Sequence, residues 1–464
     1  MENFWDFSVW GMINLIAVLL ISLLAANILR RTVPFLRASL IPTSVLGGLL
    51  LVLADWAYRL FAGSALFDSP FFGGNGTAVL ELLTYHCLAL GFIASAFRPS
   101  RGRLTRARAA EIFNTGVTTV STYLLQGILG LAVSVAAAFF VKDFFPAAGI
   151  LLPFGYGQGT GQALNYGGIF EADYGFSAGK SFGLTIAALG FLSASLGGVI
   201  HLNVLRKRGM IRPEPPRARE EQPGSAIPEE PMKDSVDRLT IQIAFIFGAY
   251  LLAWLLMFAL GQALPKMKSV IYGFNFLLGV LSATAVKALL NLLKKKGLVR
   301  KEYMDRFLMT RTGNFFFDLM IVAGIAAIRF HVLQNYWGII LIMAVSGMIL
   351  TYLYNSFVAR VLFPDYREEQ FLAMYGMLTG TASTGVILLR ELDGDFRTPA
   401  ADNLVYQNFP AIAFGFPMML LATLAPVRPV LTLLILILFF IVMNLILFRS
   451  RIFARKEKKT GPQP

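Results

Sequence analysis

The chain has one cysteine and three histidines among its 464 residues. The single cysteine, Cys87, excludes a disulfide within the chain and any metal site built from several cysteines. His86, His201 and His331 stand in separate segments, and none has a partner at the spacing of a zinc site. These scarcities argue against a disulfide-stabilised protein and against a zinc protein.

Charged residues are also scarce. They make up 15% of the chain, whereas a soluble protein carries about a quarter. Hydrophobic residues make up 56%, and the mean hydropathy is +0.64. Apolar runs of roughly 20 residues, long enough to cross a bilayer, recur from end to end. We predict eleven spans, near 8–29, 41–61, 77–97, 112–141, 177–205, 239–262, 269–293, 310–330, 333–359, 400–425 and 428–448. The expected fold class is an all-α polytopic membrane protein.

The net charge of +14 is concentrated in short loops. Arg and Lys gather in 30–40, 98–111, 206–238 and 294–301 and after Arg449, whereas 62–76, 142–147 and 331–336 contain one Lys and no Arg. Basic loops favour the cytoplasmic side. The N-terminus is therefore expected outside, and the first three basic loops and the C-terminal tail inside. Anionic lipid headgroups, and not nucleic acid, are the expected partners of these loops.

An internal repeat is the most informative motif. Residues 156–163 (YGQGTGQA) return as 375–382 (YGMLTGTA), and an acidic residue, Glu171 or Glu391, follows each copy. A packed transmembrane helix has little use for so many glycines and threonines in a row. Glycine-interrupted hydrophobic segments in corresponding halves are typical of secondary transporters built from repeats.

The chain divides into two halves at a linker, 206–238, which is rich in Pro and charge and is expected to be a mobile cytoplasmic connection. The first half, 1–205, begins with an inward-running span, and the second, 239–426, with an outward-running one. This opposite orientation predicts inverted-topology repeats. Residues 427–464 have no counterpart in the first half and are read as an extra C-terminal helix with a basic tail.

Within the halves, 147–176 and 371–398 are apolar yet broken by glycine and proline, and neither makes a comfortable full span. Each is predicted to be a re-entrant or discontinuous helix, because unpaired backbone at membrane depth needs protein or a water-filled cavity around it. The alternative is a glycine-rich face that only packs helices together.

Three stretches carry a resemblance to a known family. Residues 31–50 (RTVPFLRASLIPTSVLGGLL) look like the first loop and second helix of the bacterial sodium/glutamate symporter family, and 80–95 (LELLTYHCLALGFIAS) resembles its third helix. The segment 155–168 stands where that family has a Gly-Gly-His-Gly-Thr-Ala stretch. The resemblance covers most of 10–205 and, more weakly, 238–426.

The resemblance implies sodium-coupled uptake of a small anionic solute such as glutamate. It also implies an inner-membrane homodimer whose transport domain moves against a scaffold, as in an elevator. The sequence shows no nucleophile–base pair and no metal-spaced acidic motif, so we expect no enzymatic activity and no cofactor apart from the coupling ion. The chain departs from the family where Gln158 replaces the His, with Tyr156, Gln162 and Asn165 around it. A proton-coupled carboxylate or amino-acid transporter or exchanger remains the alternative.

The broken helices are the expected binding region, because unwound carbonyls suit a cation and half-helix N-termini suit an anion. For the solute we predict contacts with Gln158, Thr160, Gly161, Gln162, Asn165, Lys180, Thr379, Gly380, Thr381, Ser383, Thr384, Gln407 and Asn408. For sodium we predict Gly157, Gly159, Thr160, Thr379 and Asp318. The alternative for the threonines is a hydrogen bond to their own helix backbone.

Two charged residues need separate consideration. Asp318 lies inside the predicted span 310–330, where an ionisable group points to a cation or proton role. Its alternative role is a structural charge paired with Arg329 or Lys287. Lys180 could meet a substrate carboxylate, or it could reach to the membrane surface.

Overall fold

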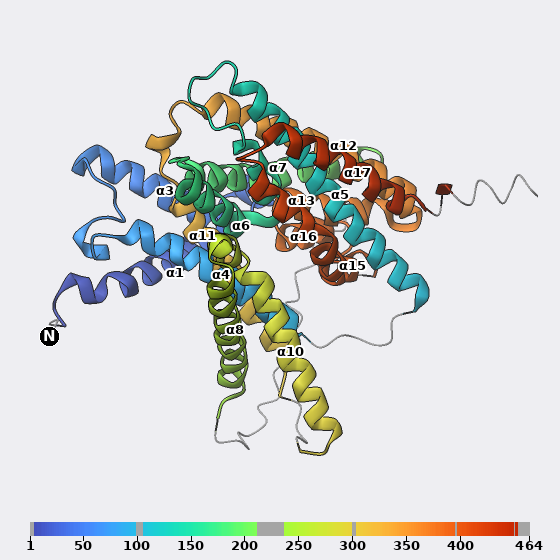
Figure 1. Ribbon diagram of the computed structural model, residues 1–464, viewed down its shortest axis with the longest axis horizontal. Helices are drawn as coiled ribbons and strands as arrows, with labels where there is room; N and C mark the ends of the chain where they lie inside the picture. The colour runs from blue at the N-terminus through green and yellow to red at the C-terminus, as the bar shows by residue number, and fades with distance from the viewer. Residues whose placement is uncertain are drawn as a thin grey trace, which may run out of the picture. The chain divides into compact units, whose positions relative to one another are not determined.

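The computed structural model describes residues 4–98, 105–210, 236–298, 303–394, 397–449 and 451–452, shown in Figure 1. Over these residues the chain forms helices and no strand. Most of the predicted linker 206–238 and most of the basic tail lie outside the described residues.

Seven helices precede the linker and ten follow it in the described chain. The first group is α1 (Phe7–Thr32), α2 (Pro34–Ala38), α3 (Thr43–Ala62), α4 (Gly76–Phe97), α5 (Arg106–Ala137), α6 (Leu151–Tyr174) and α7 (Gly179–Lys207). The second group is α8 (Arg238–Ala263), α9 (Lys268–Gly273), α10 (Asn275–Lys295), α11 (Arg306–Ala326), α12 (Trp337–Leu362), α13 (Arg367–Thr379), α14 (Ala382–Arg390), α15 (Ala400–Tyr406), α16 (Asn408–Leu424) and α17 (Pro429–Leu447).

Nine helices within the described ranges are long and apolar enough to cross a membrane, as expected of a polytopic membrane protein. They correspond to nine of the eleven predicted spans. The predicted span 400–425 forms a helix pair, Ala400–Tyr406 and Pro410–Leu424, bent by 50°. The predicted span 310–330 forms α11, which is less apolar because Arg311, Asn314 and Asp318 interrupt its hydrophobic residues.

The described chain forms two compact units, and each unit takes residues from both halves of the sequence. Unit 1 is Met1–Tyr85, Arg103–Val199 and Leu319–Pro464, and unit 2 is His86–Gly102 and Ile200–Asp318. The core of unit 2 joins α4, α8, α10 and α11 through Leu90, Ile93, Phe97, Ile246, Ala283 and Met309. Unit 1 contains α5, which packs against α6, α12, α16 and α17.

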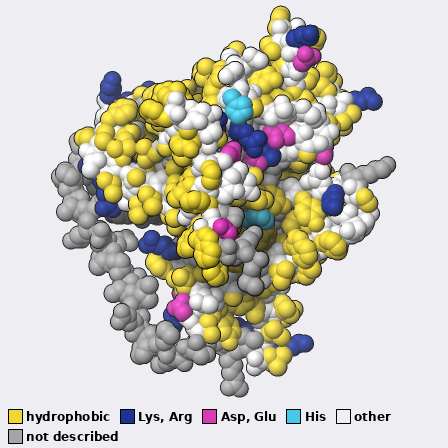
Figure 2. Space-filling model, turned by 90° about the vertical axis from the view of Figure 1, so that its left-hand side faces the viewer, with side chains coloured by type: hydrophobic (Ala, Val, Ile, Leu, Met, Phe, Trp, Pro, Cys, Tyr) yellow, Lys and Arg dark blue, Asp and Glu magenta, His cyan; other side chains and the backbone are white. Residues whose placement is uncertain are grey.

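Many large hydrophobic side chains of the described residues are exposed, and on the face drawn in Figure 2 the charged side chains occupy only small areas among hydrophobic ones. Helix α12 illustrates the pattern. Its exposed stripe is Leu341, Ile342, Val345, Ile349 and Leu353. Its opposite face is buried and includes the polar residues Thr351 and Asn355. An apolar exterior and a partly polar interior suit a helix that faces lipid on one side and other helices on the other.

Candidate functional site

Both repeated motifs interrupt a helix. In α6 the backbone leaves the helical conformation at Gly159, with φ 79° and ψ −171°. Residues with a Cβ rarely adopt such a positive φ, so glycine is needed at this position. In the second copy α13 ends at Thr379, and the chain continues through Gly380 (φ −141°, ψ −107°) and the extended Thr381 before α14 starts at Ala382.

The two breaks lie next to each other within unit 1. A Cβ atom on Gly159 would stand 3.5 Å from the methyl group of Thr381. The hydroxyl of Thr160 lies 3.4 Å from the carbonyl oxygen of Met320 on α11, and a Cβ on Gly324 would touch Thr160 at 2.7 Å. Residues that are far apart in the sequence thus form one small region, called here the crossing (Gly159, Thr160, Thr379, Gly380 and Thr381).

The crossing brings together helix ends of both polarities. The part of α6 before Gly159 and the whole of α13 end there, so that their last carbonyl groups lack helical partners. The second part of α6 and all of α14 begin there, and the N–H groups of a helix's first turn point toward its N-terminal end. Helix ends carry about half an elementary charge, positive at the N-terminus and negative at the C-terminus. The crossing can therefore favour an anion and a cation side by side.

Helix α7 holds both broken helices by close backbone approach. A Cβ on Gly190 would meet the carbonyl oxygen of Thr379 at 2.6 Å and the ring of Tyr156 at 2.9 Å. Gly183, seven residues earlier, packs in the same way against Ala163 of α6. In Figure 1, α7 lies beside α6 and α13. A glycine at every seventh residue keeps one face of a helix free of side chains.

The first residue of each motif has a matched role. The hydroxyls of Tyr156 and Ser193 lie 3.0 Å apart, and Tyr156 also donates to the carbonyl oxygen of Ala344 at 2.6 Å. Tyr375 donates to the carbonyl oxygen of the same Ser193 at 2.9 Å. These roles of Tyr156 and Tyr375 were not predicted from the sequence. Their equal position in the two copies was the signal that could have found them.

The predicted solute contacts differ in their surroundings. Thr160 and Thr379 are fully buried, and the Thr379 hydroxyl donates to its own helix at the carbonyl of Tyr375, 2.7 Å away. Ser383, in the first turn of α14, is exposed, and Gln158 is half-buried. Both sides of the break therefore offer accessible polar groups as well as buried ones.

Gln162, just after the α6 break, is the predicted solute contact with an open donor. It is buried, and its Oε1 accepts a hydrogen bond from Asn165 at 3.2 Å. Its Nε2 has no hydrogen-bond partner in the described chain. Gln407 instead packs between α5 and α13, accepting from the Thr119 hydroxyl at 2.8 Å and lying 3.2 Å from the sulfur of Met377. Its Nε2 also donates to Asn408, 2.9 Å away.

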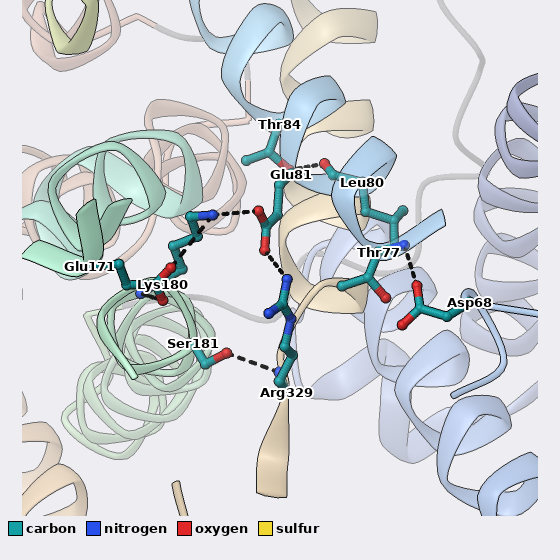
Figure 3. Close-up of polar contacts among 9 residues, drawn as sticks. All are labelled: Asp68, Thr77, Leu80, Glu81, Thr84, Glu171, Lys180, Ser181 and Arg329. Carbon is teal, nitrogen blue, oxygen red and sulfur yellow. Dashed lines mark hydrogen bonds and ion pairs between the residues drawn. The ribbon is translucent and has the colours of Figure 1, made fainter. Parts of the chain in front are cut away.

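Lys180 belongs to a charged cluster on α4, α6, α7 and the segment after α11, shown in Figure 3. Its Nζ lies 2.7 Å from Glu81 and 3.5 Å from Glu171. Arg329 approaches the second oxygen of Glu81 at 2.8 Å. Glu81 is largely buried, with 13% of its side chain exposed. This pairing favours a structural role for Lys180, and the position of Glu81 between two cations was not foreseen from the sequence.

Asp318 is exposed on α11. It precedes Met320 by two residues, so the two side chains leave the helix on nearly opposite sides. Of the two candidate partners, Arg329 pairs with Glu81, and Lys287 donates to the carbonyl groups of Ala96 and Arg98. No group of three His, Cys, Asp or Glu residues suited to a metal ion occurs in the described ranges.

Comparisons of the chain with protein-family models, with characterised proteins and with solved structures give no match. The likeness to sodium/glutamate symporters therefore remains an expectation from the sequence.

Proposed function

We propose that the protein is a secondary active transporter that carries a small anionic solute together with sodium. The observation that supports this most directly is the meeting of two helix breaks, one from each copy of the repeat, in a largely apolar helical protein. A motif that only packed helices together would have no reason to leave the helical conformation, because unpaired backbone groups are costly inside a membrane. Some motif glycines do serve packing: Gly157 faces the ring of Tyr123. Gly159 does not, since its φ of 79° breaks the helix.

The chemistry at the crossing suits a carboxylate. The first turns of α14 and of the second part of α6 present N–H groups and the positive ends of helix dipoles. Gln162 Nε2 adds a buried donor without a partner in the described chain. Carboxylates accept several hydrogen bonds at once, so a small solute with one or two carboxylates is the class that we expect to bind.

The same place suits a monovalent cation. The carbonyl groups at the ends of α13 and of the first part of α6, together with the Thr160 and Thr379 hydroxyls, are hard oxygen ligands. When sodium and the anionic solute bind at adjacent helix ends, the cation offsets the negative charge of the solute. Each ligand then favours binding of the other, which couples solute transport to sodium transport. Alternating access by an elevator movement within a homodimer belongs to this proposal and rests on the family resemblance alone.

Uptake into liposomes that contain the purified protein tests the proposal. Glutamate and other small carboxylates are offered with an imposed sodium gradient or an imposed pH gradient, each without the other. We expect concentrative uptake with inward sodium alone. Uptake that is unchanged in sodium-free buffer and collapses without a proton gradient would support the proton-coupled alternative, and Asp318→Asn should then abolish it. If no carboxylate enters under either gradient, both the sodium-coupled and the proton-coupled proposals are contradicted.

A further inference from the structure

A row of buried polar side chains runs along one face of α5 within unit 1. Thr115, Thr118, Thr122 and Gln126 follow one another at steps of three or four residues, the spacing of a single helix face. Asn355 of α12 lies opposite, and its Nδ2 approaches the Thr122 hydroxyl at 3.4 Å. Gln370 of α13 donates to the Thr115 hydroxyl at 3.2 Å. These six residues are called here the polar column, and all of them are buried.

One end of the polar column is partly open and lies beside an ion pair. The Thr115 hydroxyl donates to the carbonyl of Glu111 on the preceding turn at 2.8 Å. The Glu111 side chain is 34% exposed and pairs with Arg108. Tyr366 donates to the Glu111 carboxylate at 3.1 Å. The column is therefore open to solvent at this end through a partly exposed, arginine-paired carboxylate.

The other end of the polar column reaches the crossing. Gln126 donates through Nε2 to the carbonyl oxygen of Leu378 at 2.8 Å and to the Thr351 hydroxyl at 2.9 Å. Leu378 is the residue before Thr379, where α13 ends. The column thus joins an accessible end of α5 to one of the two helix breaks.

The amides of the polar column leave only oxygens without partners. Asn355 Nδ2 donates to the carbonyl of Thr351 at 3.0 Å, and a carbonyl can only accept, so the amide orientation is determined. The Leu378 carbonyl determines the orientation of Gln126 in the same way. Asn355 Oδ1 and Gln126 Oε1 consequently point elsewhere, and neither has a partner among the described residues. The column has two open acceptors, and the structure records no open donor among its six residues.

A small cavity lies at the middle of the polar column. Thr118, Asn355 and Gln370 line it together with apolar residues of α12 and α13, and its volume is ≈ 10 Å³. That is about the space of one water molecule. An open amide oxygen, a hydroxyl and a space of this size suit a water molecule or a dehydrated monovalent cation.

We propose that the polar column is the path by which a small alkali cation reaches the crossing from the Glu111 end, with Asn355 Oδ1 and Gln126 Oε1 as ligands along the way. Open acceptors favour a cation over an anion. The lack of carboxylates inside the column favours a monovalent over a divalent ion, which prefers carboxylate ligands. This inference rests on the proposed function for the identity of the coupling ion, but the cation path itself is testable without transport.

Cysteine variants of the full chain test the path. The buried Cys87 is replaced by alanine, and Thr118→Cys or Asn355→Cys is introduced. Ag⁺, a monovalent cation that binds thiols, is added as nitrate to inside-out or right-side-out vesicles. After a chloride quench and denaturation, a fluorescent maleimide counts the thiols that remain. Met343→Cys, equally buried on α12 but outside the column, and the exposed Leu353→Cys are the matched controls.

We expect both column thiols to be blocked by Ag⁺ from the Glu111 side only. In Thr118→Cys, which keeps both proposed amide ligands, sodium nitrate should slow the reaction at least tenfold relative to choline nitrate. Met343→Cys should stay unreacted. Column thiols that resist Ag⁺ from both sides, or react no faster than Met343→Cys, would overturn the path. If the thiols react with Ag⁺ and sodium does not slow the reaction, the column is filled by water and does not bind sodium. If sodium protects the column thiols but solute uptake into liposomes does not depend on sodium, the cation path is supported and the proposed sodium coupling is refuted.

A second measurement covers variants that fold poorly. Sodium should raise the thermal unfolding temperature of the purified wild-type protein relative to choline, because a bound ligand stabilises the folded state. Gln126→Leu removes one proposed ligand and should reduce this sodium effect, whereas Leu353→Ala on the exposed face of α12 should keep it in full. An equal sodium effect in both variants would contradict ligation by Gln126.

Discussion

Gly159 and Thr381 come from different halves of the chain, and a Cβ atom on Gly159 would lie 3.5 Å from the Thr381 methyl group. Each residue belongs to a helix break, so this contact places the two breaks together. Substituting Gly159 would add strain as well as bulk, since its φ is 79°. The crossing therefore depends on the positive φ of Gly159 and on the close approach between Gly159 and Thr381.

The matched threonines of the crossing should contribute to ligand binding. Thr→Val keeps the shape and removes the hydroxyl. Losing a hydrogen bond to a charged ligand costs roughly 1.5–3 kcal/mol, about a 10- to 150-fold loss of affinity. We expect Thr160→Val or Thr379→Val to raise the apparent constant for solute or sodium in liposome uptake, with normal membrane yield. Wild-type constants in both variants would mean that the bonds to Met320 and Tyr375 are the only role of these hydroxyls.

The glycine face of α7 should be sensitive to a single methyl group. Gly190→Ala places a Cβ 2.6 Å from the backbone oxygen of Thr379, and overpacking of this kind costs about 1–3 kcal/mol. Gly248→Ala on α8 is the control, because no atom lies within 4 Å of its new Cβ. Thermal unfolding in detergent should show a clear loss for Gly190→Ala and no loss for Gly248→Ala. Equal unfolding temperatures would show that α7 can move away from α13.

The charged cluster around Glu81 should stabilise unit 1. Glu81→Gln leaves Arg329 without the carboxylate that lies 2.8 Å away and leaves Lys180 with the longer contact to Glu171. An unsatisfied, partly buried polar group costs about 1–3 kcal/mol. Arg367→Gln breaks a more exposed ion pair, with Glu368, and should cost about 0–1 kcal/mol. Thermal unfolding of the two variants compares them, and a larger loss for Arg367→Gln would contradict this assignment.

The turn after α14 should weaken in acid. Asp393 accepts from the Arg397 N–H at 2.9 Å and from the N–H and hydroxyl of Thr398 at 2.8 and 2.6 Å. Burial alone would raise the pKa of Asp393, but these hydrogen bonds outweigh it and hold the pKa below 3.8. A carboxyl with a lower pKa in the folded chain stabilises the fold above its unfolded pKa, and this is lost as the pH falls through the folded value.

We therefore expect the wild type to unfold at a higher temperature than Asp393→Asn at neutral pH, with the gap closing below pH 3.8. The measurement is thermal unfolding of both proteins across that range. A gap that does not change at low pH would show that the charge of Asp393 does not support the turn.

Much of the fold could be predicted from the sequence, because span length and apolar composition are local properties. All eleven predicted spans fall on helices, and nine correspond to single helices long and apolar enough to cross a membrane. That a break falls within 147–176 also follows from local chemistry, since glycines allow a positive φ, but only the structure locates it at Gly159. The predicted inversion of the repeats, the sodium coupling and the solute class stay predictions.

The contacts between segments could not be predicted in this way. The sequence alone determined that the chain is helical, apolar and broken twice at matched motifs. Only the tertiary structure decided that the two breaks meet, that Tyr156 and Tyr375 share Ser193, and that Glu81 lies between Lys180 and Arg329. The physical reason is range: backbone conformation and hydrophobic length depend on neighbouring residues, whereas hydrogen bonds and ion pairs between helices depend on which helices pack together.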